Sequence, residues 1–263
     1  MHSLYNSCTI NHICHINCCK SNCCAHDKFI IIIQNIDFVN IYEQKPYGNK
    51  LCYITIILHI CSKMLKKEDA KPIARGRSSN SPCMIVFCAF EQLSTLIAAA
   101  KKHGFVNYIP LVFCKNYSPQ VLKANMRIVG ATEYALVLYR NKLPKFRNGL
   151  QIDENGKNIR GTGHMIFNWF TWEKDGKDIP KIHPAQKPVA VLKKLIEIFT
   201  DEGDVVIDPC CGSGSTLRAA AELGRSAYGF EIDRNFYERA KNEMLVFEKD
   251  EQMDISDFIG DTV

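Results

Sequence analysis

The feature that most constrains the fold of this chain is a glycine turn at residues 208–216, with the sequence DPCCGSGST. The apolar, β-branched run at residues 205–207 precedes the turn and is typical of a buried parallel strand. A helix-forming run follows at residues 217–223. Gly212 and Gly214 allow a sharp turn and let a ligand approach the backbone closely. This order of strand, turn and helix predicts an open α/β sheet with a binding site at the turn.

Two acidic residues are predicted to lie at neighbouring strand ends. Asp208 ends the first strand, and a second short strand at residues 227–230 ends at Glu231. An acid about 20 residues after a glycine turn can bind both hydroxyls of a ribose. The turn is not a dinucleotide fingerprint, because Leu217 occupies the position of the third glycine, and it lacks the lysine of a phosphate-binding loop.

The pattern D-P-x-x-G-S-G-S-T resembles motif I of the amino-group DNA methyltransferases, which bind S-adenosyl-L-methionine. The segment His183-Pro184-Ala185-Gln186-Lys187-Pro188 is similar to the H-P-x-Q-K-P segment that precedes motif I in the β-ordered, circularly permuted members. The resemblance covers roughly residues 82–247. It implies a doubly wound, mostly parallel α/β sheet of the S-adenosylmethionine-dependent methyltransferase type, similar to a Rossmann fold.

The resemblance also implies the cofactor site. The glycine turn would surround the methionine end of the donor, Glu231 would bind the ribose hydroxyls, and the H-P-x-Q-K-P segment would help to wall the methionine pocket. The residues implied are Asp208, Pro209, Gly212, Ser213, Gly214, Ser215, Thr216, Glu231, His183, Gln186, Lys187 and Pro188. Three of these residues also have a structural reading: Asp208 as a helix N-cap or turn acid, Glu231 as a solvated strand end and Lys187 as a surface lysine at a helix start.

The catalytic tetrapeptide of that family resembles [D/N/S]-P-P-[Y/F/W]. Its polar side chain accepts hydrogens from the target amine, and its ring stacks on a base flipped out of the duplex. The nearest match here is Gln44-Lys45-Pro46-Tyr47, in which Gln44 replaces the acid while Pro46 and Tyr47 are in place. An ordinary Pro-Tyr-Gly turn is the alternative. Pro82-Cys83 and Pro209-Cys210 are poor candidates for the cysteine nucleophile of another methyltransferase class, because of their order and position.

Basic residues gather at 140–182, a long polar insertion, within a chain of net charge +5. We expect the insertion to contact double-stranded DNA, with a solvated loop as the alternative. The candidate DNA-binding residues are Lys115, Lys123, Arg127, Arg140, Lys142, Lys145 and Arg147.

The chain divides by composition into an N-terminal segment at 1–60, a methyltransferase domain at 61–250 and an acidic tail at 251–263. Histidines and cysteines within residues 8–26 could ligate zinc, but their spacing lacks paired C-x2-C units. A disordered or aberrant N-terminal segment is therefore favoured, and no metal site is assigned. No apolar run is long enough for a membrane span, and no signal pattern is present, which predicts a soluble, cytoplasmic protein.

Apolar, often β-branched runs predict strands at 29–38, 51–61, 84–88, 108–114 and 134–139. Apolar stripes at helical spacing predict helices at 90–103, around 192–199 and around 236–247. Residues 116–126 read as a polar loop or short helix. The function predicted is methyl transfer to DNA, with adenine N6 preferred over cytosine N4, as in phage or restriction–modification systems. A relic that binds without turnover, and a methyltransferase for RNA, protein or a small molecule, stay open, as does the oligomeric state.

Overall fold

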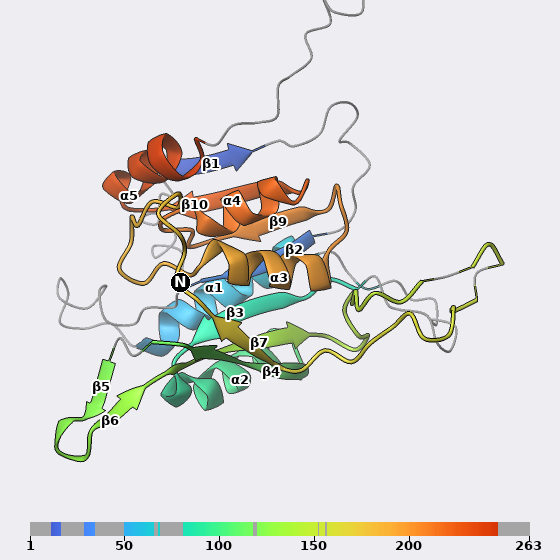
Figure 1. The fold of residues 1–263 in the computed structure, drawn as a ribbon, viewed down its shortest axis with the longest axis horizontal. Coiled ribbons are helices and arrows are strands. Elements are labelled where there is room, and N and C mark those ends of the chain that lie inside the picture. The colour runs from blue at the N-terminus through green and yellow to red at the C-terminus, as the bar shows by residue number, and fades with distance from the viewer. Residues whose placement is uncertain are drawn as a thin grey trace, which may run out of the picture.

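The fold is built on one eight-stranded sheet with the strand order β1-β10-β9-β2-β3-β7-β4-β8 (Figure 1). The structure is a computed structural model. It describes residues 12–16, 29–34, 50–65, 68, 81–117, 120–151, 153–155 and 157–246. The strands of this sheet are β1 (His12–Ile16), β2 (Phe29–Ile33), β3 (Met84–Cys88), β4 (Asn107–Lys115), β7 (Thr132–Tyr139), β8 (Trp169–Trp172), β9 (Val205–Asp208) and β10 (Ser226–Glu231).

Most neighbouring strands in this sheet run parallel, which confirms the predicted fold class. β9 pairs in parallel with β10 and β2, β2 with β3, and β4 with β8. β7 is antiparallel to β3 and β4, and β1 is antiparallel to β10. The carboxyl ends of β10, β9, β2, β3, β4 and β8 therefore meet at one edge of the sheet, called here the carboxyl edge. The opposite edge is called the amino edge.

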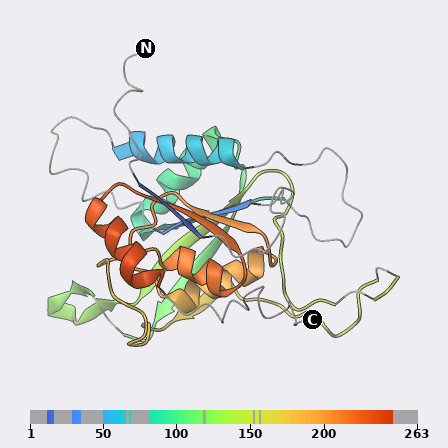
Figure 2. The same ribbon diagram turned by 90° about the horizontal axis from the view of Figure 1, so that it is seen from above.

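Helices cover both faces of the sheet. α1 (Lys50–Met64) and α2 (Leu93–Lys102) lie on one face, and α3 (Val189–Phe199) and α4 (Ser215–Glu222) lie on the other (Figure 2). α5 (Arg234–Arg239) continues into a π-helical turn at Ala240–Met244. A 3-10 turn at Phe90–Gln92 precedes α2.

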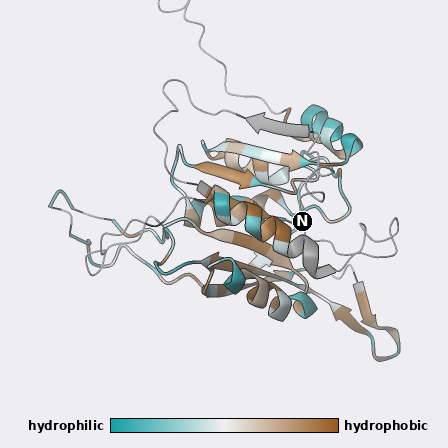
Figure 3. Cartoon of the chain, turned by 180° about the vertical axis from the view of Figure 1, so that it is seen from behind, coloured by the Kyte–Doolittle hydropathy of each residue, from teal (hydrophilic) through white to brown (hydrophobic). Residues whose placement is uncertain are grey.

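β2 shows how the sheet divides the core. Ile30 and Ile32 face the layer of α3 and α4, whereas Ile31 and Ile33 face the layer of α1 and α2. All four side chains are at most 2% exposed, because a central strand has both faces covered. The hydrophobic residues concentrate in the central strands of the sheet (Figure 3). β2 precedes residue 61, where the sequence placed the start of the domain, yet it lies at the centre of the sheet.

Two predicted elements are wrong. Residues 51–61, expected as a strand, belong to helix α1. Leu58, Cys61 and Leu65 are buried at helical spacing while Ile56 and Ile60 are exposed, so packing against the sheet selected a helix over the β-propensity of this run. Residues 116–126 contain strand β5 (Gln120–Lys123) and a 3-10 turn at Ala124–Met126, and β5 forms a hairpin with β6 (Ile128–Gly130).

The insertion at 140–182 begins at the amino edge, because the antiparallel β7 ends there. It forms an irregular hairpin: Asn148 and His164 pair through backbone and side-chain hydrogen bonds, and the Gln151 carbonyl accepts a bond from the Ile159 amide. The hairpin projects away from the sheet (Figure 1). The sequence reading missed β8 inside this insertion. No helix in the described part of the chain is long and apolar enough to cross a membrane.

Candidate functional site

The glycine turn lies at the carboxyl edge, between β9 and α4. Gly212 and Gly214 have φ values of +50° and +77°, in the left-handed region that favours glycine. Gly214 caps α4, and a Cβ on it would approach the Cβ of Ala240 to 3.3 Å. In the sheet, β9 lies between β10, which follows it in the chain, and β2. The turn after β9 therefore lies at the point where the strand order reverses. Open α/β sheets bind their ligands at such a point.

Glu231 reaches back from the end of β10 to this turn. One carboxylate oxygen accepts a hydrogen bond from the Gly212 amide at 2.8 Å, and the other accepts one from the Asp233 amide at 2.8 Å. The sequence expectation placed Asp208 and Glu231 at neighbouring strand ends, and the parallel pairing of β9 with β10 brings the two strand ends together.

Asp208 is fully buried within a network of polar side chains. One carboxyl oxygen accepts a bond from the Cys210 amide at 3.1 Å, and the other accepts one from Gln34 Nε2 at 3.1 Å. Gln34 Nε2 also donates to Thr216 Oγ1 at 2.5 Å, and Gln34 Oε1 accepts from Ser215 Oγ at 3.1 Å. Burial raises the pKa of Asp208 to about 7, against the hydrogen bonds that favour the carboxylate. Gln34 thus ties the end of β2 to the glycine turn.

One buried polar atom of the turn has no partner. Ser213 is 1% exposed, and its Oγ makes no hydrogen bond. Buried polar atoms are nearly always paired, so an orphan hydroxyl in a glycine turn suits a site that is completed by a ligand. The ring of His183 lies 3.8 Å from where a Cβ on Gly212 would be, and it packs edge-on against Phe236 at 4.6 Å between centroids. The H-P-x-Q-K-P segment therefore adjoins the turn.

A cavity of about 1030 Å³, called here the edge cavity, opens at the carboxyl edge over β3, β7, β4 and β8. Its lining includes the ends of β3 and β4, the start of β7 and most of the H-P-x-Q-K-P segment. Aromatic rings on its walls come from Phe87, Phe90, Tyr117, Tyr134 and Trp172. Four lysines and three acidic residues also line it: Lys115, Lys174, Lys181, Lys187, Glu91, Glu133 and Asp175.

Two lysines share one carboxylate inside this cavity. Lys115 Nζ lies 2.5 Å from Glu133 Oε1, and Lys187 Nζ lies 2.9 Å from Glu133 Oε2. The lysine side chains are only 10% and 5% exposed. Burial disfavours the charged form of Glu133, but Lys187 and Lys115 together lower its pKa. Both ammonium groups lie over the Trp172 ring, at 5.0 and 5.5 Å from its centroid. These three charged groups are called here the cavity triad.

The other residues of the H-P-x-Q-K-P segment hold their own loop. Gln186 Oε1 accepts from the Ile182 amide and its Nε2 donates to the Pro180 carbonyl, both at 3.0 Å. Pro188 precedes α3, and Asp175 accepts a bond from the Val189 amide at 2.8 Å. Pro184, Gln186, Lys187 and Pro188 line the edge cavity, so the segment lies between that cavity and the glycine turn.

Four of the predicted DNA-binding cations lie at the amino edge, away from the glycine turn. Lys145 is 4% exposed and pairs with Asp201, at 2.7 Å, and with Asp204. Arg147 binds Asp201 with two hydrogen bonds of 2.5 and 2.6 Å. Arg140 donates to the Ser62 carbonyl at the end of α1, and Lys142 follows it in the chain. A buried lysine between two carboxylates is an anchor for the insertion, so the expectation of a phosphate contact does not fit Lys145.

The remaining cations named from sequence lie at the carboxyl edge. Lys115 ends β4 within the cavity triad, Lys123 belongs to β5, and Arg127 is exposed in the turn of the β5–β6 hairpin. The same hairpin exposes Val121, Leu122, Met126, Ile128 and Val129. Leu122 and Gly130 also line the edge cavity, so the hairpin stands beside the mouth of that cavity.

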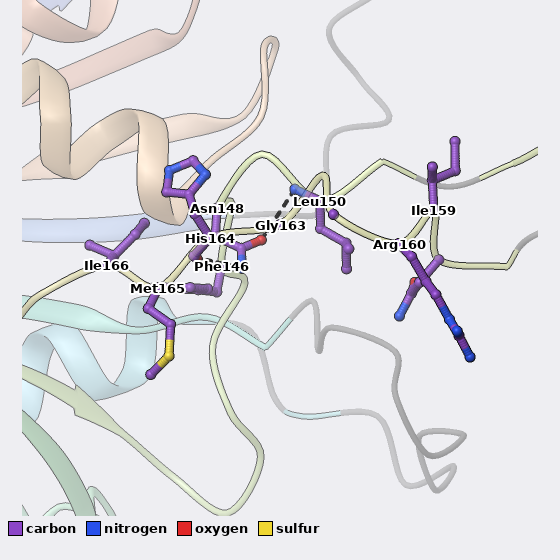
Figure 4. Close-up of a pocket in the computed structure, with 11 residues that line it drawn as sticks. Phe146, Asn148, Leu150, Ile159, Arg160, Gly163, His164, Met165 and Ile166 are labelled. Carbon is purple, nitrogen blue, oxygen red and sulfur yellow. Dashed lines mark hydrogen bonds between the residues drawn. The ribbon is translucent and has the colours of Figure 1, made fainter.

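A smaller cavity of about 560 Å³ lies within the insertion (Figure 4). It is lined by Phe146, Asn148, Leu150, Asn158, Ile159, Arg160, Gly161, Gly163, His164, Met165 and Ile166. Met165 is 90% exposed, and the Leu150 amide donates to Asn148 Oδ1 at 3.3 Å. This cavity belongs to the hairpin that leaves the amino edge, so it is separate from the glycine turn.

Gln44, Pro46 and Tyr47 lie outside the described residues. Burial raises the pKa of both Cys83 and Cys210, so neither thiol is activated as a nucleophile. Among the described residues no cluster of three or more His, Cys, Asp or Glu side chains is arranged to hold a metal ion, and most of the N-terminal cysteine cluster lies outside them.

Comparison with known proteins identifies the family. The model of a family described as DNA methylase, named N6_N4_Mtase, matches residues 35–242. This chain belongs to that family. The match includes the glycine turn, Glu231, the H-P-x-Q-K-P segment and residues 44–47.

Two curated relatives illustrate the DNA methylase membership. The type II methyltransferase M.MjaI of Methanocaldococcus jannaschii is 32% identical over 164 residues, which are 57% of this chain and 53% of that protein. The DNA adenine methyltransferase YhdJ of Escherichia coli is 26% identical over 189 residues, which are 67% of this chain and 60% of that protein. The chain thus spans between half and two thirds of the length of these relatives.

Solved structures share the fold. The M1.HpyAVI–SAM complex matches with a TM-score of 0.55 and 24% identity, over 82% of this chain and 87% of that one. The cytosine-N4-specific PvuII DNA methyltransferase matches with a TM-score of 0.56 and 17% identity, over 83% of this chain and 79% of that one.

Sequence reasoning missed three parts of this site: Gln34, Glu133 and Phe90. Gln34 carried a readable signal, because a polar residue directly after a buried strand tends to lie at the ligand edge of an α/β sheet. Glu133 and Phe90 carried none, since only the pairing of β7 with β4 and β3 brings Glu133 beside Lys115 and Phe90 beside Tyr134.

Proposed function

We propose that this protein transfers a methyl group from S-adenosyl-L-methionine to an exocyclic amine of a base in DNA. The observation that carries the proposal is the glycine turn at the switch point of the sheet, with Asp208 and Glu231 beside it, in a chain of the DNA methylase family. Names of the relatives support DNA as the substrate, and the structural neighbours share the fold.

The donor site is proposed to use the residues of the turn and the adjoining loop. S-adenosyl-L-methionine supplies an electrophilic methyl group on a sulfonium sulfur. The orphan Ser213 hydroxyl and the backbone around Gly212 and Gly214 would bind it, with His183 bordering the site. Glu231 is proposed to bind the ribose hydroxyls, and its oxygens, which already accept two backbone hydrogen bonds, would be shared between both roles.

The transfer requires help because the lone pair of an exocyclic amine is delocalised into the ring of the base. The C–N bond forms as the C–S bond breaks, the C–S electron pair stays on sulfur, and the nitrogen then releases one proton to a base or to water. A polar acceptor near the amine localises the lone pair. We assign this role to Gln44, with Pro46 shaping the turn and Tyr47 stacking on the flipped base.

Adenine N6 is the proposed target, from the tyrosine at position 47. Relatives and neighbours include both a DNA adenine methyltransferase and a cytosine-N4-specific enzyme, so cytosine N4 is the alternative target.

Double-stranded DNA is proposed to approach the carboxyl edge. Arg127 on the β5–β6 hairpin and Lys174 and Lys181 at the edge cavity supply positive charge there. The amino-edge cations Lys145 and Arg147 are excluded from this contact, because their charges are already neutralised by Asp201 and Asp204.

A second candidate is a protein that binds S-adenosyl-L-methionine or DNA without turnover. Gln44 in place of an acid favours it, because a neutral amide is a weaker hydrogen-bond acceptor than a carboxylate. A methyltransferase for RNA, protein or a small molecule is a third candidate, which the same assay separates by its substrate.

The experiment is transfer of tritiated methyl from S-adenosyl-L-methionine to mixed-sequence duplex DNA, followed by nucleoside analysis. The proposal expects incorporation into N6-methyladenine. Incorporation into N4-methylcytosine would keep the enzyme class and change the base. Donor binding by well-folded protein without incorporation into DNA would refute the proposal in favour of the non-catalytic protein, and incorporation into RNA or protein alone would redirect it.

A further inference from the structure

The β5–β6 hairpin exposes apolar side chains on both of its strands and at its tip, and the proposed function above uses only its arginine. The strands Gln120–Lys123 and Ile128–Gly130 are joined by a 3-10 turn at Ala124–Met126. The exposed fractions are 61% for Val121, 53% for Leu122, 69% for Met126, 43% for Ile128 and 44% for Val129. Apolar side chains that gather outside a core mark a surface that contacts a partner.

The fold of the chain does not bury this hairpin. β5 and β6 form a sheet of their own, which extends beyond the main sheet (Figure 1). Val121 and Val129 are direct partners across the two strands, and both side chains stay exposed. A lone two-stranded hairpin is at best marginally stable in water. A hairpin that keeps its apolar side chains in water is therefore suited to burying them against a partner.

The charge of the hairpin indicates what that partner is. Residues 116–132 contain two cations, Lys123 and Arg127, and no Asp or Glu. Arg127 is exposed directly after Met126, at a φ of +55° that is uncommon for residues other than glycine. The Arg127 amide donates to the Ala124 carbonyl at 3.1 Å, so the turn holds an apolar and a cationic residue together at the tip. Such a tip fits a partner that is anionic outside and apolar inside.

Duplex DNA is the partner of that kind. Its phosphates lie outside a stack of bases, and its major groove admits a two-stranded β-ribbon. A second copy of this chain fits less well, because pairing two hairpins about a two-fold axis brings the cations of both copies together, and facing like charges are destabilising. A wholly apolar groove on another protein would leave the two cations without a counter-charge.

We propose that the β5–β6 hairpin is a wedge that enters the DNA duplex at a base step, with Met126 inserted between the bases and Arg127 bound to a neighbouring phosphate. Methionine is unbranched and adaptable, and it is one of the apolar side chains that proteins insert between base steps. Leu122 and Gly130 border the edge cavity, so the wedge opens the duplex at the carboxyl edge. This inference rests on the proposed function, which brings DNA to that edge and requires a base to leave the stack.

Fluorescence anisotropy with two labelled duplexes tests the wedge without turnover. The duplexes have the same mixed sequence, and one of them has a single abasic site at its centre. A wedge must unstack a base step in the intact duplex, whereas the abasic duplex already offers a gap in the stack. The full-length protein is expected to bind the abasic duplex more tightly by about 10-fold or more.

Two variants separate insertion from charge. Met126→Ala is expected to remove most of the preference, by weakening the binding of the abasic duplex. Met165→Ala is the matched control, because Met165 is 90% exposed in the insertion that leaves the amino edge, and it should keep the preference. Arg127→Asn, which tolerates a positive φ, should weaken the binding of both duplexes equally and lower the slope of log affinity against log salt by about 1.

Three outcomes would overturn the inference. They are equal affinity of the wild type for the two duplexes, the same loss of preference from Met165→Ala as from Met126→Ala, and a dimer in sedimentation that Met126→Ala dissociates. Urea unfolding checks that each variant is folded.

Methyl transfer to DNA is measured on the same protein. Transfer without a Met126-dependent preference for the abasic duplex removes the wedge and leaves the function. A Met126-dependent preference in a protein that binds S-adenosyl-L-methionine but transfers no methyl group supports the wedge and refutes the function.

Discussion

Two buried lysines lie at opposite edges of the sheet, and they differ in the number of carboxylates around them. Lys145 at the amino edge and Lys187 at the carboxyl edge are both 4% exposed and both are ion-paired. At the amino edge, Lys145 and Arg147 meet two carboxylates, so the charges balance. At the carboxyl edge, Lys187 and Lys115 share the single carboxylate of Glu133. The first cluster anchors a loop, and the second is suited to a ligand.

The largest effect on stability is expected from a substitution in the ion-pair cluster at the amino edge. Lys145→Met should lower the free energy of unfolding by about 4 kcal/mol, because Asp204, with only 10% of its side chain exposed, loses its buried partner. Urea unfolding measures the change. The control is Arg160→Met, an exposed cation of the same insertion, which should change stability by less than about 0.5 kcal/mol. If Lys145→Met left stability intact and instead weakened DNA binding, the assignment of the two edges would be reversed.

The second prediction concerns the pH dependence of the free energy of unfolding, which is expected to come from Asp208 at the glycine turn. Burial raises the pKa of Asp208 from 3.8 to about 7, so the folded state favours the protonated acid. Stability from this group is therefore fully present below pH 4 and is lost as pH rises through 7. A tenfold change in a protonation equilibrium corresponds to about 1.4 kcal/mol, so the loss of stability amounts to a few kcal/mol at most. Asp208→Asn should flatten the profile between pH 4 and pH 8 in urea titrations, and an unchanged profile would place the titrating group elsewhere.

Gly214→Ala should have a smaller effect on stability and a selective effect on binding. A left-handed alanine costs about 1–2 kcal/mol, and the new Cβ would crowd Ala240. Gly104→Ala is the matched control, because Gly104 also has a positive φ, of +85°, but has open space around a Cβ and follows α2, remote from the turn. Both variants should lose similar stability in urea, and only Gly214→Ala should lose the rise in melting temperature on adding S-adenosyl-L-methionine. Equal loss of that rise in both would argue against a donor site at the turn.

The smallest stability effect is expected from Lys187→Met. Lys115 stays paired with Glu133, so the remaining pair is neutral and the loss should be below about 1 kcal/mol, far less than for Lys145→Met. The KM for DNA should rise nonetheless, in steady-state methylation assays. A loss of stability as large as that of Lys145→Met would show that the cavity triad is structural.

The sequence was informative where the site is local and uninformative where it is assembled over long range. Asp208, the glycine turn and Glu231 lie within 24 consecutive residues, and strand–turn–helix geometry brings them together. Phe90, Glu133 and Lys187 come from distant segments, and only the strand order of the sheet places them in one cavity. The position of the basic insertion was also unreadable, because it depends on β7 running antiparallel and so ending at the amino edge.

Secondary structure followed the same rule. Strands β3, β4, β7, β9 and β10 were predicted because each is an apolar run bounded by turn residues. Helix α1 was mistaken for a strand, since its run of isoleucines has high β-propensity and only its packing on the sheet selects the helix.

The most direct test is calorimetric titration of the full chain with S-adenosyl-L-methionine. The account predicts saturable heat with one site per chain for the wild type and for Gly104→Ala, and no heat for Gly214→Ala at a temperature where all three proteins are folded. Absence of heat with folded wild-type protein, or equal heat with Gly214→Ala, would contradict the claim that the glycine turn between β9 and α4 holds the methyl donor.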